Sequence, residues 1–361
     1  MKMTLLRRDG IKKGAKPHEI AAIFFSETLA PVMLLTGAGG TGKSALIHTI
    51  MELMKTHKCG HLLVTAYTGV AAAPFGGPTV LRLLGFGINK KDHSFVKQLN
   101  PQEVDKLRRK FKDECGVDID DIGGIVIDEV SFNQLALFGH IDGRLRQLMR
   151  QPNLPCGGIP LLLCGDNHQK APPACPMTWY QELVQHAMNP SKGPYKYGPT
   201  TARAVGHRLL VQARRYNLTK MMRAKNDPEF QECQEQMRDT SSSTPISESF
   251  VRKLQPVSIT DLQDDEGWLF APVGVLSKIE RDSINISQLK TFAKHFDLPL
   301  VKWKLPMYDV VPDLDVRTGL YENEENLYGY FVEGAPVHMT ETIKSVRKLV
   351  NGTPGLFDSL V

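Results

Sequence analysis

The stretch Gly37-Ala-Gly-Gly-Thr-Gly-Lys43-Ser44 decides the fold of this chain. It matches the pattern G-x-x-x-x-G-K-[ST], in which glycines let consecutive backbone N–H groups wrap phosphate oxygens. An apolar run, Val32 to Thr36, precedes the stretch, and a helix-forming run from Ala45 to Met54 follows it. This order of strand, loop and helix predicts a P-loop nucleotide-binding domain and disfavours the alternative of a glycine-rich turn without a ligand.

The side chains of this loop have distinct expected tasks. Lys43 would neutralise the β- and γ-phosphates, and the Ser44 hydroxyl would ligate Mg²⁺. The expected phosphate-binding residues are Gly37, Ala38, Gly39, Gly40, Thr41, Gly42, Lys43 and Ser44.

A pair of carboxylates follows another apolar run. Ile125-Val-Ile is followed directly by Asp128 and Glu129, and α/β sheets bind their ligands at the carboxyl ends of strands. Asp128 would hold the Mg²⁺ shell with Ser44, and Glu129 would orient and deprotonate the attacking water. Adjacent carboxylates suit ATP hydrolysis rather than nucleotide storage, so ATP and Mg²⁺ are the expected cofactors.

Apolar runs without alternation predict a parallel sheet that is buried on both faces. These runs span residues 32–36, 62–65, 124–128 and 160–164. Helices are expected from Asn100-Pro101 to Gly116, from a cap at Ser131 to an end before Pro152, and from Asp227-Pro228 to about Arg238. The second would carry an apolar stripe from Leu135 to Leu148. Residues 267–272 predict a strand of a second α/β unit. The predicted fold class is therefore α/β.

Charge and composition narrow the class of protein. The 361 residues carry a net charge of +5, but nine basic residues and one acidic residue between Gln181 and Lys225 make that window +8 and the remainder −3. Such a block suits contact with a polyanion, although a solvated surface loop explains the charge equally well. No apolar stretch approaches the roughly 20 residues of a membrane helix. The six scattered cysteines disfavour a zinc site or a disulfide framework and favour a reducing compartment.

The chain also resembles superfamily one helicases of the petite-integration-frequency family in several segments that keep the family's order. Thr65 to Thr79 is similar to the family's DNA-contacting segment, and Gly165 to Pro173, with its Gly-Asp-Asn-His-Gln run, is similar to its sensor segment. Leu218 to Phe230 is similar to its arginine-bearing segment. Shorter segments, such as Gly334-Ala-Pro-Val337, are similar to parts of the family's second motor domain and extend the resemblance to about Gly355.

The resemblance implies an ATP-driven 5′→3′ DNA helicase that couples ATP hydrolysis to translocation on single-stranded DNA in repair, recombination, replication and telomere maintenance. It implies a basic segment at residues 1–20, a first RecA-like motor domain at 21–215 and a second, incomplete RecA-like domain at 216–361. A C-terminally truncated member is expected, because the family's last two motifs have no counterpart before Val361. A nuclear or otherwise intracellular location is expected, with mitochondria as the alternative, and no obligate protein partner can be inferred.

The same resemblance assigns further residues. Gln169 would sense the γ-phosphate, and Arg223 would cross from the second domain as an arginine finger. The expected catalytic residues are Lys43, Asp128, Glu129, Gln169 and Arg223, and those expected along single-stranded DNA are Thr65, Thr68, Gly69 and Thr79. Tyr67, Phe75 and Trp179 could stack on bases, although burial in the core is the stronger expectation for each.

Two other functions remain open on these residues. A DNA-independent P-loop ATPase switch would keep Lys43, Asp128 and Glu129 without using DNA. A degenerate helicase remnant would bind single-stranded DNA without turning over ATP.

Overall fold

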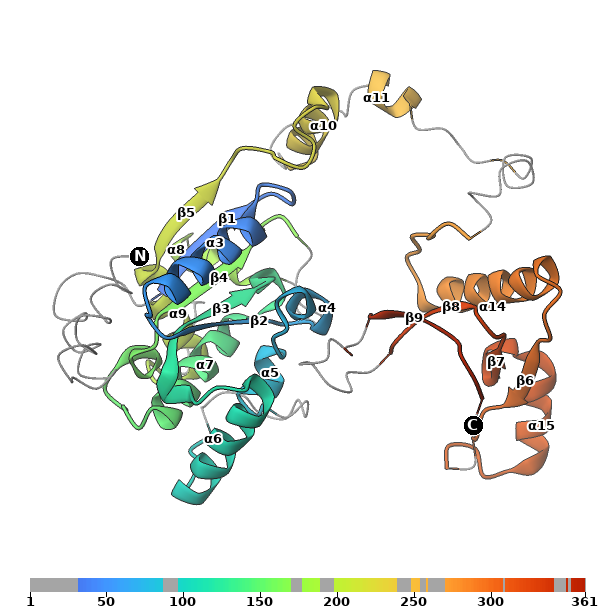
Figure 1. Cartoon of the computed structure of the whole chain (residues 1–361), viewed down its shortest axis with the longest axis horizontal. Coiled ribbons are helices and arrows are strands. Elements are labelled where there is room, and N and C mark those ends of the chain that lie inside the picture. The colour runs from blue at the N-terminus through green and yellow to red at the C-terminus, as the bar shows by residue number, and fades with distance from the viewer. Residues whose placement is uncertain are drawn as a thin grey trace. The chain divides into compact units, whose positions relative to one another are not determined.

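The computed structural model describes ten parts of the chain, which are residues 32–86, 97–169, 177–188, 198–238, 248–253, 258, 270–307, 309–340, 349 and 352–360. The chain divides into two compact units (Figure 1), the first Met1–Ser247 with Glu341–Asn351 and the second Glu248–Thr340 with Gly352–Val361. None of the described helices is long and apolar enough to cross a membrane.

A five-stranded parallel sheet forms the centre of the first unit, in the order β2-β3-β4-β1-β5 (Figure 1). Its strands are β1 (Val32–Gly37), β2 (His61–Ala66), β3 (Ile122–Asp128), β4 (Leu161–Gly165) and β5 (Arg214–Leu218). The first four confirm the four predicted runs. The fifth has no apolar run because it is an edge strand whose first four residues are exposed, so its sequence lacks the signal of a buried strand.

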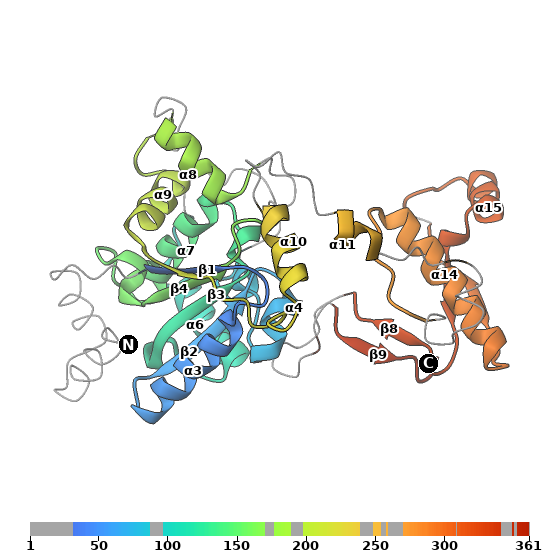
Figure 2. The ribbon, with the colours of Figure 1, turned by 90° about the horizontal axis from the view of Figure 1, so that it is seen from above.

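Helices cover both faces of this sheet (Figure 2). They are α3 (Lys43–Thr56), α4 (Gly69–Ala72), α5 (Val80–Leu83), α6 (Pro101–Cys115), α7 (Leu135–Leu148), α8 (Trp179–Met188), α9 (Ala202–Gln212) and α10 (Pro228–Arg238), with short 3₁₀ turns η1 (Ala73–Phe75), η2 (Ile119–Asp121), η3 (Val130–Phe132) and η4 (Pro155–Gly158). On one face Leu35, Val126 and Leu162 pack with Ile47 of α3. On the other, Leu34 and Ile127 belong to the larger core with α6, α7 and α9. Successive strand residues therefore fill two cores.

Helix starts and stops follow the predicted signals at α6 but not at α7. Asn100 and Glu103 form a capping box at the start of α6, and Gly116 ends it at φ 72°. The predicted cap at Ser131 is wrong: Ser131 lies in η3, and α7 begins after Gln134, whose side chain makes no capping hydrogen bond. The predicted apolar stripe of α7 is buried from Leu135 to Leu148.

The first unit extends beyond the expected boundary at residue 215. Strand β5 pairs with β1 from Met33↔Arg214 to Gly37↔Leu218, and α10 follows it within the same compact unit. The sheet therefore needs residues up to Leu218, because they complete its edge beside β1.

The described residues of the second unit form helices and two small antiparallel sheets. Its elements are α11 (Glu248–Lys253), α14 (Lys278–His295), β6 (Val301–Lys304), α15 (Leu314–Asn323), η6 (Glu325–Leu327), β7 (Tyr328–Phe331), β8 (Pro336–His338) and β9 (Pro354–Leu356). Strand β6 pairs with β7, and β8 pairs with β9. Of the strand predicted at 267–272, residues 267–269 lie outside the described residues and 270–272 are not in a strand.

Candidate functional site

The loop after β1 is shaped for an anion. Gly40 and Gly42 have φ values of 88° and 92°, a conformation that side chains disfavour. Gly42 caps α3, and the first turn of this helix has neither a side-chain cap nor an acidic residue. Its N–H groups are therefore left for a ligand with negative charge.

The Lys43 ammonium lies over the same loop. Its Nζ donates to the carbonyl oxygens of Gly37 at 2.8 Å and Ala38 at 3.0 Å. Thr41 Oγ1 also donates to the Ala38 carbonyl, at 2.8 Å. The cation is thus held at the loop by neutral acceptors, which leaves its charge available to phosphate oxygens.

The predicted carboxylates stand opposite this cation, at the end of β3. Asp128 Oδ1 accepts the backbone N–H of Glu129 at 2.9 Å. Burial raises the pKa of Asp128 above its usual value, although that N–H and Lys43 oppose the rise. Burial and the neighbouring Asp128 also raise the pKa of Glu129, against the influence of Lys43. The two acids therefore form a crowded pair in the field of Lys43, as a cation-binding, water-activating site requires.

Glu129 itself adopts a left-handed backbone conformation, with φ 55° and ψ 41°. Non-glycine residues seldom occupy this region, and functional sites are where such strain is retained. The 3₁₀ turn η3 follows at once, so the conformation turns the chain sharply off the end of β3.

The predicted sensor segment lies beside this turn. Ser131 Oγ donates to Gln169 Oε1 at 3.0 Å, which connects Gln169 to the loop that carries Glu129. Asp166, at the start of the segment, accepts the backbone N–H of His168 at 3.0 Å on its carboxylate and that of Gln169 at 3.2 Å on its carbonyl. Pro172 and Pro173 of this segment lie outside the described residues.

Arg223 lies in the first unit, which corrects the expectation that it crosses from a second domain. The backbone N–H groups of Met222 and Arg223 donate to the Gly40 carbonyl at 2.9 and 3.1 Å. A Cβ on Gly40 would stand 2.8 Å from the Arg223 Cβ. The arginine-bearing segment thus lies directly on the phosphate loop because the chain turns over that loop after β5.

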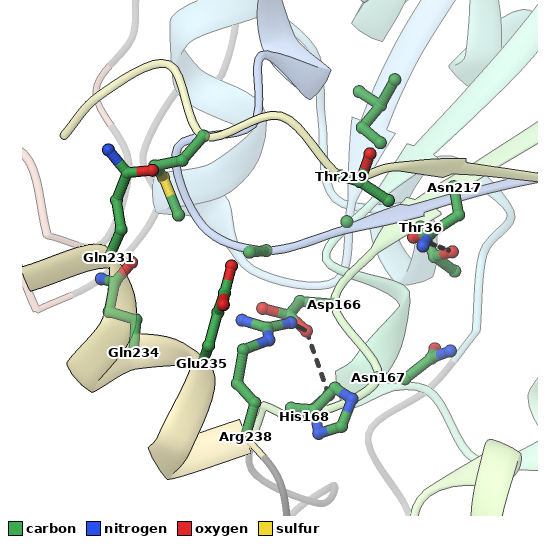
Figure 3. Close-up of a pocket in the computed structure, with 14 residues that line it drawn as sticks. Thr36, Asp166, Asn167, His168, Asn217, Thr219, Gln231, Gln234, Glu235 and Arg238 are labelled. Atoms are coloured by element: carbon green, nitrogen blue, oxygen red, sulfur yellow. Dashed lines mark hydrogen bonds and ion pairs between the residues drawn. The ribbon is translucent and has the colours of Figure 1, made fainter. Parts of the chain in front are cut away.

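A cavity of about 350 Å³ opens between the phosphate loop, the sensor segment and α10 (Figure 3). Gly37 and Ala38 line it from the loop, and Asp166 from the sensor segment. Arg238, from the last turn of α10, forms an ion pair with Asp166 in this cavity. Burial alone would raise the pKa of Asp166, but Arg238 and the His168 N–H together hold it below its usual value.

The four residues expected along DNA differ in their surroundings. The Thr65 side chain is fully buried, and its hydroxyl donates to the Val126 carbonyl of β3 at 3.1 Å, so its assignment as a DNA contact is corrected to a structural one. Thr68 and Thr79 are half-buried and cap α4 and α5, and Gly69 is the first residue of α4. These three lie after the end of β2, where Thr79 bridges to Ala66.

The described residues of the basic window differ in their surroundings. Arg203 pairs with the buried Glu182 at 2.8 Å, whereas Arg214 and Arg215 lie exposed on β5. Lys192 and Lys196 lie outside the described residues. Trp179 is buried against Phe138, which confirms the expectation of core burial for it.

Sequence reasoning missed two residues of the site. Ser131, expected as a helix cap, instead donates to Gln169. Arg238 was expected only as the end of a helix, and its ion pair with Asp166 spans 72 residues of sequence. An arginine at the end of a helix with few apolar residues could have indicated an ion pair for Arg238. Its partner, Asp166, cannot be identified without the fold.

Comparisons with known proteins agree with this geometry. A family model described as PIF1-like helicase matches residues 18–195. The ATP-dependent DNA helicase PIF1 of Saccharomyces cerevisiae is 33% identical over 138 residues, which are 38% of this chain and 15% of the yeast protein. The human ATP-dependent DNA helicase PIF1 is 31% identical over 155 residues, or 43% of this chain and 22% of the human protein. The chain therefore spans less than a quarter of the length of these two relatives.

Solved structures show the same fold. The Pif1 helicase from Candida albicans superposes with a TM-score of 0.54 at 21% identity, over 95% of this chain and 68% of that chain. Bacteroides Pif1 bound to ssDNA gives 0.53 at 19% identity, over 96% and 69%. With the parallel sheet and the phosphate loop, these matches confirm the predicted P-loop NTPase fold.

The buried hydroxyl of Thr65 gives a direct test of its corrected role. Thr65→Val should lower the free energy of unfolding by about 1 kcal/mol, because the Val126 carbonyl loses its donor. Urea unfolding followed by circular dichroism measures this difference. Affinity for single-stranded DNA should stay within twofold of the wild type, and a larger loss in a folded variant would restore the DNA-contact assignment.

Proposed function

Because this chain belongs to the PIF1-like helicase family, we propose that it hydrolyses ATP and couples the hydrolysis to translocation on single-stranded DNA. The observation that carries the proposal is the convergence of Lys43, Asp128, Glu129 and Gln169 at one edge of the sheet. The relatives are named ATP-dependent DNA helicases, and one family structure holds ssDNA. The same proposal includes the family's roles in DNA repair and recombination and an intracellular location, nuclear or mitochondrial.

The phosphates of ATP fit the loop between β1 and α3. The uncapped N-terminus of α3 presents backbone N–H groups, and Gly40 and Gly42 keep the loop free of side chains. Lys43 would exchange its carbonyl acceptors for phosphate oxygens, a stronger charge-assisted bond. Binding therefore needs only a change of partner for the ammonium group.

The acids fit a divalent cation. Asp128 and the Ser44 hydroxyl would hold Mg²⁺, since hard oxygen ligands suit this ion and ATP supplies further oxygens. Mg²⁺ would neutralise charge on the phosphates. Glu129 would accept a proton from the attacking water, a task for which a carboxylate with a raised pKa is suited.

The sensor and the arginine would report on the γ-phosphate. Gln169 accepts a hydrogen bond from Ser131, which lies in the loop that carries Glu129. A contact between the Gln169 amide and the γ-phosphate would therefore also affect the position of the proposed base. Arg223 would stabilise charge on the transferring phosphoryl group from its place over Gly40. Thr68, Gly69 and Thr79 would contact DNA phosphates at the end of β2.

ATP turnover with and without single-stranded DNA tests the proposed function. We expect DNA to stimulate turnover in the wild type, and Lys43→Ala to lower the stimulated rate by roughly 10²-fold or more. Lys55→Ala, on the exposed face of the same helix, is the matched control and should be unchanged. Turnover that ignores DNA would identify an ATPase switch, and DNA binding without turnover would identify a non-enzymatic remnant.

Glu129→Gln separates binding from chemistry. The amide keeps the size of the side chain but cannot accept the proton of the attacking water, so turnover should fall by about 10²-fold or more. Nucleotide affinity, measured by fluorescence anisotropy of a labelled ATP analogue, should persist. Glu52→Gln, at an exposed position of α3, is the control. Unchanged turnover in Glu129→Gln would remove Glu129 from the role of base.

Arg223→Ala tests the arginine in its corrected position. Turnover should fall by about 10³-fold while nucleotide is still bound, because the lost charge acts mainly on the transition state. Lys225→Ala removes an exposed charge from the same segment and should leave turnover within twofold. Equal effects of the two variants would indicate that the segment contributes only general positive charge.

A further inference from the structure

Contacts to the phosphate loop before α10 and to the sensor segment in its last turn join this part of the chain to the site. Before its first residue, the N–H groups of Met222 and Arg223 bind the Gly40 carbonyl of the phosphate loop. In its last turn, Arg238 binds Asp166 of the sensor segment. Between these ends only Cys233 is buried, so little apolar packing determines where the helix lies.

The Asp166 carboxylate is the better buried partner of the ion pair, with 6% of its side chain exposed against 28% for Arg238. A buried carboxylate that loses its cation is strongly destabilised, or it takes up a proton. Arg238 is the only ion-pair partner of Asp166 in the described part of the chain. Arg238 is therefore the nearest cation that stabilises the charge on Asp166, and the His168 N–H and Lys43 act in the same direction.

Asp166 in turn holds the sensor turn together. Its carboxylate accepts the His168 N–H and its carbonyl accepts the Gln169 N–H. The Gln169 side chain then accepts a hydrogen bond from the hydroxyl of Ser131, which lies two residues after Glu129. The two loops also touch directly, since a Cβ on Gly165 would stand 2.8 Å from the Val130 Cγ2. A displacement of Asp166 would thus be passed to the turn and to the loop of the proposed base.

We propose that Arg238 is a positioning residue of the ATPase site, which through Asp166 holds Gln169 beside Ser131 and the loop of Glu129. The inference rests on the proposed ATP hydrolysis for its catalytic effect. The geometry of the turn is independent of that activity. Figure 3 shows Arg238 projecting from α10 toward Asp166, and both residues line the cavity.

The first measurement needs no turnover. Hydrogen exchange of the full chain, followed by mass spectrometry on peptides that contain residues 166–169, should be at least about threefold faster in Arg238→Gln, because the His168 and Gln169 amides lose a fixed acceptor. Arg150→Gln is the matched control, since it removes an arginine that pairs with Asp105 at 2.6 Å on the surface of the same unit. Its exchange in this segment should equal that of the wild type.

The second measurement is steady-state ATP turnover with single-stranded DNA. Arg238→Gln should lower kcat by roughly 10-fold with KM within twofold, because misplacement of Gln169 and Glu129 affects the reaction more than nucleotide binding. Arg238→Lys, which keeps the charge, should restore most of kcat. Asp166→Asn should resemble Arg238→Gln, and the double variant should be no worse than either single one, as expected of groups that act as a unit.

The outcomes separate the two levels of the inference. Unchanged exchange together with unchanged kcat in folded Arg238→Gln would overturn the positioning role. A raised KM with normal kcat would also overturn it, since Arg238 would then be a direct ligand of ATP. Faster exchange in a chain whose wild type does not hydrolyse ATP would support the link from Arg238 to the sensor turn while refuting the proposed function.

Discussion

Parallel strand pairing is the constraint on which the rest of the first unit depends. Because β1, β3, β4 and β5 run in the same direction, the loops that follow them leave the sheet at one edge. The phosphate loop, the two acids, the sensor segment and the arginine-bearing segment are those four loops. The phosphate loop and the arginine-bearing segment, which lie far apart in the sequence, are therefore in contact at this edge.

The electrostatics of this edge follow from the same convergence. Asp128, Glu129 and Asp166 come from two neighbouring strands, and Lys43 influences the pKa of all three. Asp166 alone has a close partner of opposite charge, and it alone has a pKa below its usual value. The other two keep raised pKa values, so their place is energetically costly until a further cation joins them. Fold stability and ligand binding thus make opposite demands on the same side chains.

Much of this arrangement could be predicted from local sequence, but long-range contacts could not. The phosphate loop, the acids after β3 and the box that starts α6 each carry their signal within eight residues. The role expected of Thr65 is wrong because a threonine in a sequence pattern is the same residue whether its hydroxyl faces solvent or the next strand. Arg223 was placed in the wrong unit because β5, an exposed edge strand, has no apolar run to extend the first domain. Arg238 was overlooked because its partner lies across the fold.

The left-handed backbone conformation of Glu129 affects which substitutions at this position would stabilise the protein. A glycine at this position would relieve conformational strain of about 1 kcal/mol, and it would also remove one half-buried acid from the crowded edge. The residue that best fits the backbone at position 129 is therefore not the glutamate that is proposed to activate water. Selection for stability alone would therefore favour glycine over glutamate at this position.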